Sequence, residues 1–366
     1  MKPLILPGSY WDPQIFDVET QLFESEMWIF AGLTSDLQNH NDFVTVTVGR
    51  QPVVVQNFQG DLRAFKNVCT HRFSQIQTTP KGNRPLVCPY HGWNFDHTGK
   101  PIGIPSKPHF GTIDEATLKQ LCLTPWQVDS VGKFVFVNSS ESGASLREFL
   151  GSTTKVLEAI SPGIGQEIDR NDLELGCNWK IAVENTLESY HVAAVHQNTF
   201  LRLGTSGQEF LFEGPHSSWQ TGVNAKTQDM WEKVSHLYET RKYRQSGYFH
   251  QFIFPNLTIA TTFGNSFSVQ RFEPMAVDRT QFISWVYDTP LELHKPVEKA
   301  IVASMNQSIT AFNRAVFLED KTVCAHVQSG VRHAQGEGLL SDIEGRVFAF
   351  QEAYQAVRMG SHVSAR

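Results

Sequence analysis

Two short segments, Cys69-Thr-His71 and Cys88-Pro-Tyr-His91, each pair one cysteine with one histidine, and 16 residues separate them. A Rieske [2Fe–2S] cluster takes two cysteine sulfurs on one iron and two histidine nitrogens on the other. These four side chains are therefore the ligand set that such a cluster needs. Because histidine is neutral where a thiolate is anionic, this set raises the reduction potential above that of an all-cysteine cluster. We predict a centre that passes single electrons.

A structural zinc site is the alternative, because zinc also accepts two cysteines and two histidines. Zinc fingers usually place both cysteines in one segment and both histidines in the next. Here each segment mixes the two residue types, which lets each metal of a two-iron cluster take a matched pair. Pro89 and Gly92 suit a tight loop at the second segment. The order of the ligands therefore favours the iron–sulfur cluster.

The composition indicates a large globular protein. The 366 residues are 40% hydrophobic, with 26 Phe and 8 Trp, which predicts a sizeable core and roughly two domains. The net charge is −6 and no basic block is present, which argues against nucleic acid as a partner. No apolar run approaches the ~18 residues of a transmembrane helix, and the first residues carry too short an apolar run for a signal peptide. We expect a cytoplasmic protein with no membrane partner, in which Cys122, Cys177 and Cys324 are buried thiols.

The first part of the chain predicts a small β module. Apolar residues recur at helical spacing over 14–30, whereas alternating or β-branched runs at 43–48, 52–55 and 133–137 predict strands. We therefore expect an N-terminal helical segment over residues 1–39 that packs on the second domain. An all-β domain whose loops hold the cluster is expected over residues 40–145.

The second part predicts a mixture of strands and helices over residues 146–366. A curved antiparallel sheet flanked by long helices fits such an α+β pattern. The helical stretches lie at 145–160, 296–330 and 341–358, and the strand-like stretches at 247–262, 266–273 and 281–287.

A second set of candidate ligands lies between Asn178 and His196. His191 and His196 with one carboxylate can hold Fe(II) on three positions and leave the others open for O₂ and substrate. Residues five apart on a continuous helix diverge by ~140°, so the helix must end or bulge between the two histidines. Glu184, Glu188 and His191 fall on one helical face, which would place both carboxylates beside His191.

These histidines could instead only cap or pack a helix. In a chain that carries an electron-supplying cluster, however, a mononuclear iron is the expected acceptor, and we favour metal binding. The third ligand is expected from the helical stretch that contains Glu319 and Asp320, between which spacing does not decide. Aromatic residues are the candidate cavity walls: Phe200, Phe210, Phe212, Trp219, Trp231, Phe249 and Phe252.

The chain resembles the Rieske non-heme iron oxygenases, the catalytic α-subunits of ring-hydroxylating and related systems, over nearly its whole length. This resemblance implies a helix-grip catalytic domain and a mononuclear iron held by His191, His196 and Asp320. The matching motifs are Phe43-Val-Thr-Val, Pro52-Val-Val-Val, Ala64-Phe-Lys-Asn67-Val-Cys69, Cys88-Pro-Tyr-His91-Gly-Trp93, Asn178-Trp179-Lys180 and Glu188-x₂-His191-x₄-His196.

The resemblance also implies an activity and partners. An NAD(P)H-dependent flavin or iron–sulfur reductase, directly or through a ferredoxin, would supply electrons to a terminal oxygenase. The oxygenase would use O₂ to hydroxylate a small organic substrate at an aromatic ring or at an N- or O-methyl group. In the implied homotrimer, Glu188 bridges His91 of one subunit and His191 of its neighbour.

Two positions depart from the usual family pattern. Glu188 replaces a more frequent Asp and resembles the carnitine and betaine oxygenases, which gives a quaternary-ammonium monooxygenase or N-demethylase as the alternative substrate class. Phe73 stands where the family usually has Gly. The alternative from another functional class is a Rieske electron carrier without oxygenase activity. The motif around His191 and His196 argues against this alternative.

Overall fold

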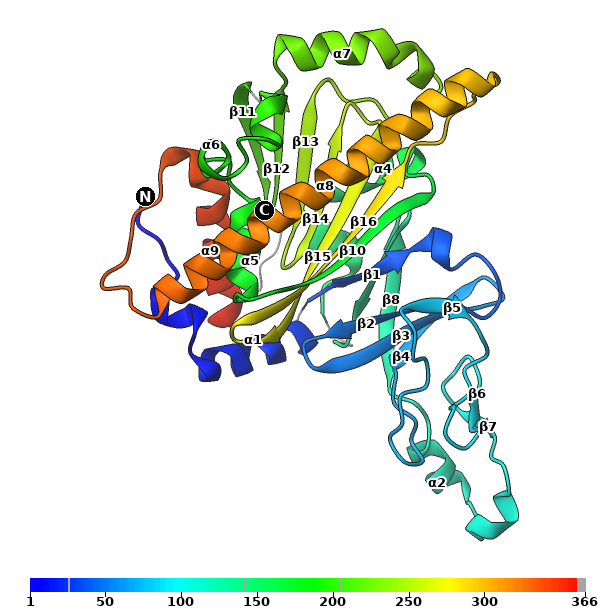
Figure 1. The fold of residues 1–366 in the computed structure, drawn as a ribbon. Coiled ribbons are helices and arrows are strands. Elements are labelled where there is room, and N and C mark those ends of the chain that lie inside the picture. The colour runs from blue at the N-terminus through cyan, green and yellow to red at the C-terminus, as the bar shows by residue number, and fades with distance from the viewer. Residues whose placement is uncertain (26, 141–142, 205, 361–366) are drawn as a thin grey trace. The chain divides into compact units, whose positions relative to one another are not determined.

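The strands expected at 43–48 and 52–55 form a hairpin in the computed structural model, which describes residues 1–25, 27–140, 143–204 and 206–360 (Figure 1). They are β2 (Asp42–Val48) and β3 (Gln51–Phe58), which pair antiparallel. Gln59 and Gly60 then turn the chain with φ of 59° and 99°. Positive φ at both central positions is typical of a type I′ two-residue hairpin turn, and this turn leads directly into β4 (Asp61–Lys66), the next partner of β3.

Residues 20–147 form one unit, which we call the small unit. Its seven-stranded antiparallel sheet has the order β1-β9-β8-β4-β3-β2-β5, and β6 pairs with β7 in a separate ribbon. The remaining elements here are β1 (Ile29–Leu33), β5 (Lys81–Asn83), β6 (Asn94–Phe95), β7 (Pro101–Gly103), β8 (Pro125–Val131), β9 (Phe134–Asn138) and α2 (Glu115–Gln120).

The helix expected over 14–30 is shorter than predicted. It is α1 (Pro13–Ser25), and Ile29 already begins β1, which pairs with β9. Every residue of β1 is buried, and the Phe30 ring lies 5.8–5.9 Å from the rings of Phe134 and Phe136. Pairing and core packing therefore override the local helical periodicity.

Residues 1–19 and 148–366 form the large unit. Its sheet is also seven-stranded and antiparallel, with the order β10-β16-β15-β14-β13-β12-β11, which confirms the predicted α+β class. The strands are β10 (Glu167–Leu175), β11 (Ser206–Glu213), β12 (His216–Gly222), β13 (Tyr248–Ile253), β14 (Leu257–Thr262), β15 (Ser266–Ala276) and β16 (Arg279–Asp288). The other helices are α3 (Leu146–Leu150), α4 (Thr153–Ile160), α5 (Trp179–Thr186), α6 (Val192–Val195), α7 (Ala225–Ser235), α8 (Pro296–Val331) and α9 (Gly345–Arg358).

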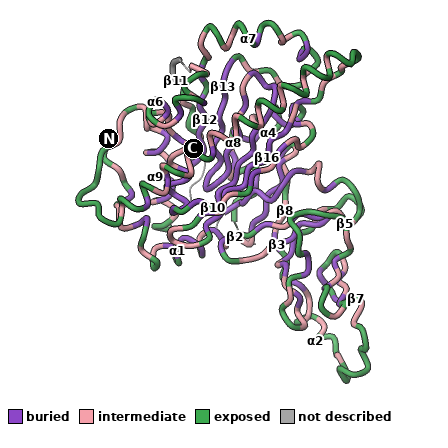
Figure 2. Tube along the Cα trace, viewed as in Figure 1, coloured by how far each residue is buried: buried purple, intermediate pink, exposed green. Residues whose placement is uncertain are grey.

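The long helix α8 crosses the sheet of the large unit (Figure 1). It begins at Pro296, whose missing N–H and fixed φ suit the first turn. Phe317, Cys324 and Gln328 are buried, and their spacing of seven and four residues puts them on one face. Asp320 shares that face. Figure 2 shows the buried trace following the central strands, whereas much of α7 is exposed.

The strand β10 was not predicted because polar residues interrupt its apolar pattern. Asp169 and Asn171 are both buried. Asp169 forms a two-point ion pair with Arg314 of α8, and its Oδ2 lies 2.9 Å from Nε of Arg314. A buried acid on a strand is tolerated only with such a partner, and the partner is 145 residues away in sequence.

The N-terminal residues are joined to α5 and α9 by buried ion pairs and hydrogen bonds. Lys180 Nζ lies 2.6 Å from Oε1 of Glu19, and both side chains are at most 1% exposed. Trp179 Nε1 donates to Glu19 Oε2 at 2.8 Å, and the Tyr354 hydroxyl also donates to Glu19. We call Glu19, Trp179, Lys180 and Tyr354 the Glu19 cluster.

A second acid, the half-buried Glu184, lies next to this cluster on α5. The Tyr10 hydroxyl contacts both oxygens of Glu184 at 2.8 and 2.9 Å, and Gln351 Nε2 donates to Glu184 at 2.9 Å. Burial raises the pKa of Glu184 to about 7, although the hydrogen bonds from Gln351 and Tyr10 and the nearby Lys180 oppose the shift. Segments from both ends of the sequence therefore meet on α5.

No helix in the described ranges is long and apolar enough to span a bilayer. The domain limits expected at residues 40 and 146 stay predictions.

Candidate metal centres

The two histidines of the second motif flank a single helical turn. Asn178 caps α5, with its side chain accepting from the Lys180 N–H at 3.1 Å, and α5 ends at Thr186. His191 directly precedes α6, and His196 directly follows it. Because no continuous helix runs through both residues, the ~140° divergence that a helix would impose does not apply.

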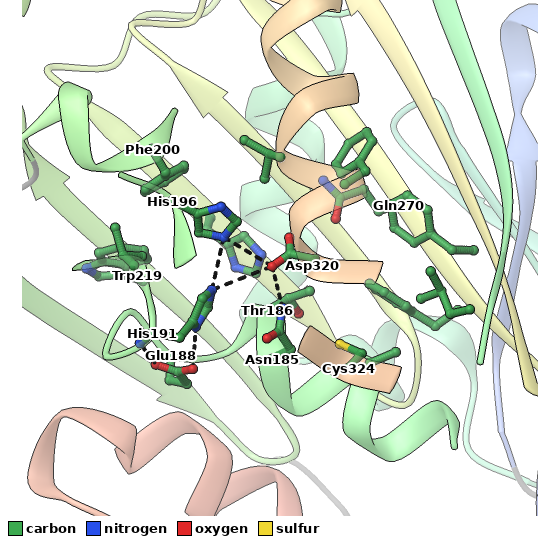
Figure 3. A pocket seen from close by; sticks show the side chains of 18 of the residues that line it. Asn185, Thr186, Glu188, His191, His196, Phe200, Trp219, Gln270, Asp320 and Cys324 are labelled. Carbon is green, nitrogen blue, oxygen red and sulfur yellow. Dashed lines mark hydrogen bonds and ion pairs between the residues drawn. The ribbon is translucent and has the colours of Figure 1, made fainter. Parts of the chain in front are cut away.

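His191, His196 and Asp320 point toward one another from α6 and α8 (Figure 3). The Nε2 atoms of the two histidines lie 3.1 Å apart. Asp320 Oδ1 lies 3.1 Å from His196 Nε2 and 3.6 Å from His191 Nε2. Two imidazoles and one carboxylate are the donor set of mononuclear non-heme Fe(II) sites.

The spacing of these three atoms fits one metal ion. Donors about 2.1 Å from a metal and at right angles to one another lie about 3.0 Å apart. The observed separations of 3.1, 3.1 and 3.6 Å are close to that value. The three residues can therefore occupy one face of a coordination sphere and leave the opposite face open.

Both imidazoles have their other nitrogen held by a carboxylate. Glu188 contacts Nδ1 of His191, and Glu319 Oε2 lies 2.6 Å from Nδ1 of His196. The Thr199 hydroxyl donates to the same Glu319 oxygen at 2.6 Å. A carboxylate at Nδ1 fixes the proton there, so the lone pair of Nε2 is directed to the shared centre.

The neighbours Glu319 and Asp320 therefore have different places. Asp320 faces the shared centre, where Asn185 Nδ2 donates to its Oδ1 at 2.8 Å, whereas Glu319 lies behind His196. Burial disfavours the charged form of His196, but Asp320 and Glu319 outweigh burial and raise its pKa. Sequence spacing alone left the choice between Glu319 and Asp320 open. Consecutive residues on a helix point about 100° apart, and the sequence does not show which of the two directions faces His196.

The expectation that Glu184 lies beside His191 is wrong. It assumed one helical face through Glu184, Glu188 and His191, but α5 ends at Thr186. Glu188 reaches His191, while Glu184 turns to Tyr10 and Gln351.

A cavity of about 90 Å³ adjoins the three candidate ligands. Phe200 and Trp219 line it as predicted, whereas Phe210, Phe212, Trp231, Phe249 and Phe252 are not among the described residues of its wall. Trp231 instead stacks on Phe263 with ring centroids 4.6 Å apart. The rest of its wall includes Tyr248, His250, Gln270, Phe272, Phe282, Val316 and Phe317.

In the small unit, the two Cys–His segments fold into equivalent loops. The backbone N–H of Phe73 donates to the carbonyl of Cys69, and that of Gly92 to the carbonyl of Cys88, both at 2.9 Å. Phe73 and Gly92 have φ of 60° and 72°. The loop thus needs a left-handed residue at its fifth position, where glycine fits without strain and Phe73 does not.

The four candidate cluster ligands gather at the tips of these loops. Cys69 and Cys88 are 1–2% exposed, and burial raises the pKa of the Cys69 thiol to about 11. The rings of His71 and His91 lie 4.6 Å apart, and His71 stacks on Trp93 at 4.9 Å. His71 Nδ1 is buried without a hydrogen-bond partner in the described ranges. A buried nitrogen without a partner, beside a second imidazole and two thiols, fits a metal ligand of a [2Fe–2S] cluster.

Two family models match the chain. Residues 27–121 match the Rieske [2Fe-2S] domain, and residues 166–359 match the ring hydroxylating alpha subunit (catalytic domain). The second match alone covers more than half of the 366 residues.

Individual proteins show the same likeness. The anthranilate 1,2-dioxygenase large subunit of Acinetobacter baylyi is 32% identical over 197 residues, which are 52% of this chain and 41% of that protein. The glycine betaine monooxygenase oxygenase subunit of Pseudomonas aeruginosa is 29% identical over 189 residues, 51% of this chain and 43% of that protein. The matched region thus spans less than half of either relative.

A solved structure extends the likeness of the fold to nearly the whole chain. The quaternary ammonium Rieske monooxygenase CntA, in complex with its substrate L-carnitine, has a TM-score of 0.79 and 20% identity, covering 98% of this chain and 95% of that one. Together with the family matches, the paired loops and the converging histidines lead to one conclusion: the chain belongs to the ring-hydroxylating alpha-subunit family, with a Rieske [2Fe–2S] domain ahead of a catalytic domain that binds mononuclear iron.

Proposed function

We propose that this protein is the terminal oxygenase of a Rieske oxygenase system in the cytoplasm. It accepts electrons from an NAD(P)H-dependent reductase, directly or through a ferredoxin, and uses O₂ to hydroxylate a small organic substrate. The observation that carries the proposal is the convergence of His191, His196 and Asp320 at a cavity, in a chain that also has a Rieske domain. A pure electron carrier has no use for this second centre.

In this proposal Cys69, His71, Cys88 and His91 hold the cluster, and His191, His196 and Asp320 hold the iron. When bound, the cluster supplies single electrons and the iron supplies O₂ activation. The cavity walls orient the substrate against the open face of the ligand set and limit the access of water.

Glu188 has a double task in the proposal. Its carboxylate holds the Nδ1 proton of His191, so Nε2 remains available to the metal. In a head-to-tail homotrimer, the same carboxylate also accepts from His91 of the neighbouring subunit and links the two metal centres. Its position supports this role, because Glu188 lines the cavity only two residues before Tyr190, which is 67% exposed.

The substrate class has two candidates. An aromatic ring can stack on the rings of the cavity wall, as in an aromatic dioxygenase. A trimethylammonium group can contact the faces of the same rings, among them Phe200, Trp219 and Tyr248, as in a quaternary-ammonium monooxygenase or N-demethylase. The bridging residue Glu188 favours the second candidate by its resemblance to the carnitine and betaine oxygenases.

Iron analysis of His191→Ala tests the function. We expect about three irons per chain in the wild type and about two in the variant, because the cluster keeps its two. The visible absorption of the cluster should persist, whereas substrate-dependent O₂ uptake with a surrogate reductase should stop. The exposed residue His333 provides the matched control, and His333→Ala should keep all three irons.

Two results would contradict the proposal. Coupled product formation by His191→Ala would exclude the assigned iron site, and two irons per chain in the wild type would indicate the electron carrier.

Glu188→Ala should stop turnover while the cluster absorption stays unchanged. Loss of that absorption would assign Glu188 a structural role instead.

A further inference from the structure

One strand of the cavity wall presents two polar side chains to the same face. Tyr248 and His250 lie two residues apart on β13, so they project from the same side of the sheet, and both line the cavity. The ring of Tyr248 is held by edge-on contacts with Phe200 at 5.0 Å and Trp219 at 5.3 Å. These contacts fix the phenol in the wall.

A buried arginine on α9 determines which proton His250 carries. Arg346 is 1% exposed, and its Nη2 lies 3.1 Å from Nδ1 of His250. A guanidinium has donors only, so Nδ1 must accept and the proton of the neutral imidazole stands on Nε2. Burial and Arg346 both lower the pKa of His250 well below its usual value, which keeps the ring neutral.

Two donors on β13 are left without acceptors, and Nε1 of Trp219, which also lines the cavity, is a third. Neither the Nε2–H of His250 nor the hydroxyl of Tyr248 has a hydrogen-bond partner among the described residues. Burial raises the pKa of Tyr248, so the hydroxyl keeps its proton. Donors of buried side chains normally have partners in the folded protein, and a cavity that leaves these donors free is shaped for an acceptor.

The charge behind these donors is not neutralised by the chain. Arg346 contacts Ser217 and His250, forms no ion pair with an acid in the described ranges, and leaves its Nη1 without a partner. Burial lowers the pKa of its guanidinium to about 9, which still leaves it protonated at neutral pH. Arg346 therefore places a positive charge behind His250, while the carboxylates of Glu188 and Asp320 lie elsewhere in the wall, and a buried charge of this kind calls for a counter-charge.

We propose that Tyr248 and His250, backed by Arg346, form the subsite for an anionic oxyacid group of the substrate, a carboxylate or sulfonate. The Tyr248 hydroxyl and the Nε2–H of His250 donate hydrogen bonds to two oxygens of this group, and the rest of the substrate faces the iron. The inference rests on the proposed function only for the statement that this anion belongs to the molecule being oxidised. An aromatic acid and a betaine-type zwitterion share this chemistry.

Binding of matched ligand pairs tests the subsite without turnover. Benzoate is compared with benzamide, and glycine betaine with choline, by calorimetry on the cluster- and iron-loaded protein under nitrogen. We expect at least one carboxylate to bind about 10-fold or more tightly than its counterpart that lacks the carboxylate, as hydrogen bonds to a charged group allow. The pair that shows this preference identifies the aromatic or the betaine source.

Variants then separate the subsite from other effects. Tyr248→Phe and His250→Leu should each remove most of the preference, measured as the ratio of the two affinities, whereas His250→Gln keeps a donor near Nε2 and should retain part of it. Tyr243→Phe changes a tyrosine that does not line the cavity and should have no effect. The melting temperature and cluster absorption show that each variant is folded.

Three results overturn the proposal: no preference for a carboxylate in either pair, no binding of either carboxylate, or full preference in both Tyr248→Phe and His250→Leu. The last would mean that the metal itself holds the carboxylate. O₂ uptake is measured separately. A carboxylate preference without coupled turnover supports the anion subsite while contradicting the oxygenase function.

Discussion

Glu319 and Asp320 stand side by side in the sequence but contact opposite nitrogens of one imidazole. Asp320 lies at Nε2 of His196 and Glu319 at Nδ1, where Thr199 also donates to the Glu319 carboxylate. One helix, α8, therefore supplies a candidate ligand to the iron and also orients a second candidate ligand. The contacts at both nitrogens oppose rotation of the His196 ring away from the centre.

Substitution of the two acids should separate these tasks. Glu319→Gln keeps an acceptor for Nδ1 but loses the charge, and we expect iron affinity to fall about 10- to 100-fold, as is usual for the partner of a metal-bound histidine. Asp320→Asn removes an anionic ligand, and we expect its iron affinity to fall further than that of Glu319→Gln. Iron retained against a graded chelator measures both, with Glu352→Gln, an exposed acid on α9, as control. Equal losses in Glu319→Gln and Asp320→Asn would contradict the division of roles.

Phe73 is a strained residue at the edge of a cluster loop. Its φ is 60° and its side chain is 78% exposed, so in this chain little packing offsets the strain. Phe73→Gly should stabilise the small unit by about 0.5–1 kcal/mol, because relief of the left-handed strain exceeds the entropy that glycine adds to the unfolded state. The temperature at which the cluster absorption disappears should rise.

Ser74→Gly, at the next position and without a positive φ, should not raise that temperature. If the cluster absorption of Phe73→Gly disappeared at a lower temperature than that of the wild type, the exposed Phe73 ring would have to make a stabilising contact with another subunit.

At the scale of elements, the half-buried acid Glu184 links the stability of the large unit to pH. Its pKa is about 7 in the folded protein against an ordinary value of 4.5. Between these values the unfolded chain has already released the proton that the folded protein keeps. The free energy of unfolding therefore falls as pH rises through this window, by about 3 kcal/mol at most.

Glu184→Gln should remove this dependence. The amide oxygen still accepts from Tyr10, and no proton is lost between pH 5.5 and 7.5. The difference between the urea midpoints at these two pH values should be smaller in the variant than in the wild type. Glu174→Gln, an exposed acid on β10, should keep the wild-type difference. An unchanged difference in Glu184→Gln would show that Glu184 is ionised throughout this range.

Elements with a clean apolar period could be predicted from the sequence, and those defined by distant partners could not. The hairpin of β2 and β3 and the helix α8 follow from alternation and from helical spacing. In contrast, β10 contains the buried residue Asp169, whose partner Arg314 lies on α8. The residues of β1 have a helical pattern in the sequence, and they form a strand because they pair with β9.

The same limit applies to the sites. His191, His196 and Asp320 lie together; a short motif gives the spacing of the two histidines, whereas Asp320 was expected only from the resemblance. The role of Glu319 and the donors Tyr248 and His250 depend on contacts between elements far apart in the sequence. No local pattern encodes such contacts.

At the scale of the whole molecule, the proposed homotrimer can be tested by mixing subunits. A Cys88→Ser subunit lacks the cluster, and a His191→Ala subunit lacks the iron, so neither should turn over alone. If electrons pass between neighbours in a ring, random mixed trimers should recover about a quarter of the wild-type activity, since each junction needs one intact donor and one intact acceptor. Co-expression with differently tagged subunits and O₂ uptake would measure this. No recovery in verified mixed trimers would mean that electrons stay within one chain.

The Glu19 cluster sets an order of events during synthesis of the protein. Glu19 emerges from the ribosome early, but Tyr354 follows 335 residues later, which takes about 17 to 67 s at typical elongation rates. Residues 20–147 are complete long before that, so the paired Cys–His loops can acquire their cluster while the nascent large unit still lacks α8 and α9. Truncated nascent chains that end before α8 should therefore already carry the cluster spectrum but no third iron.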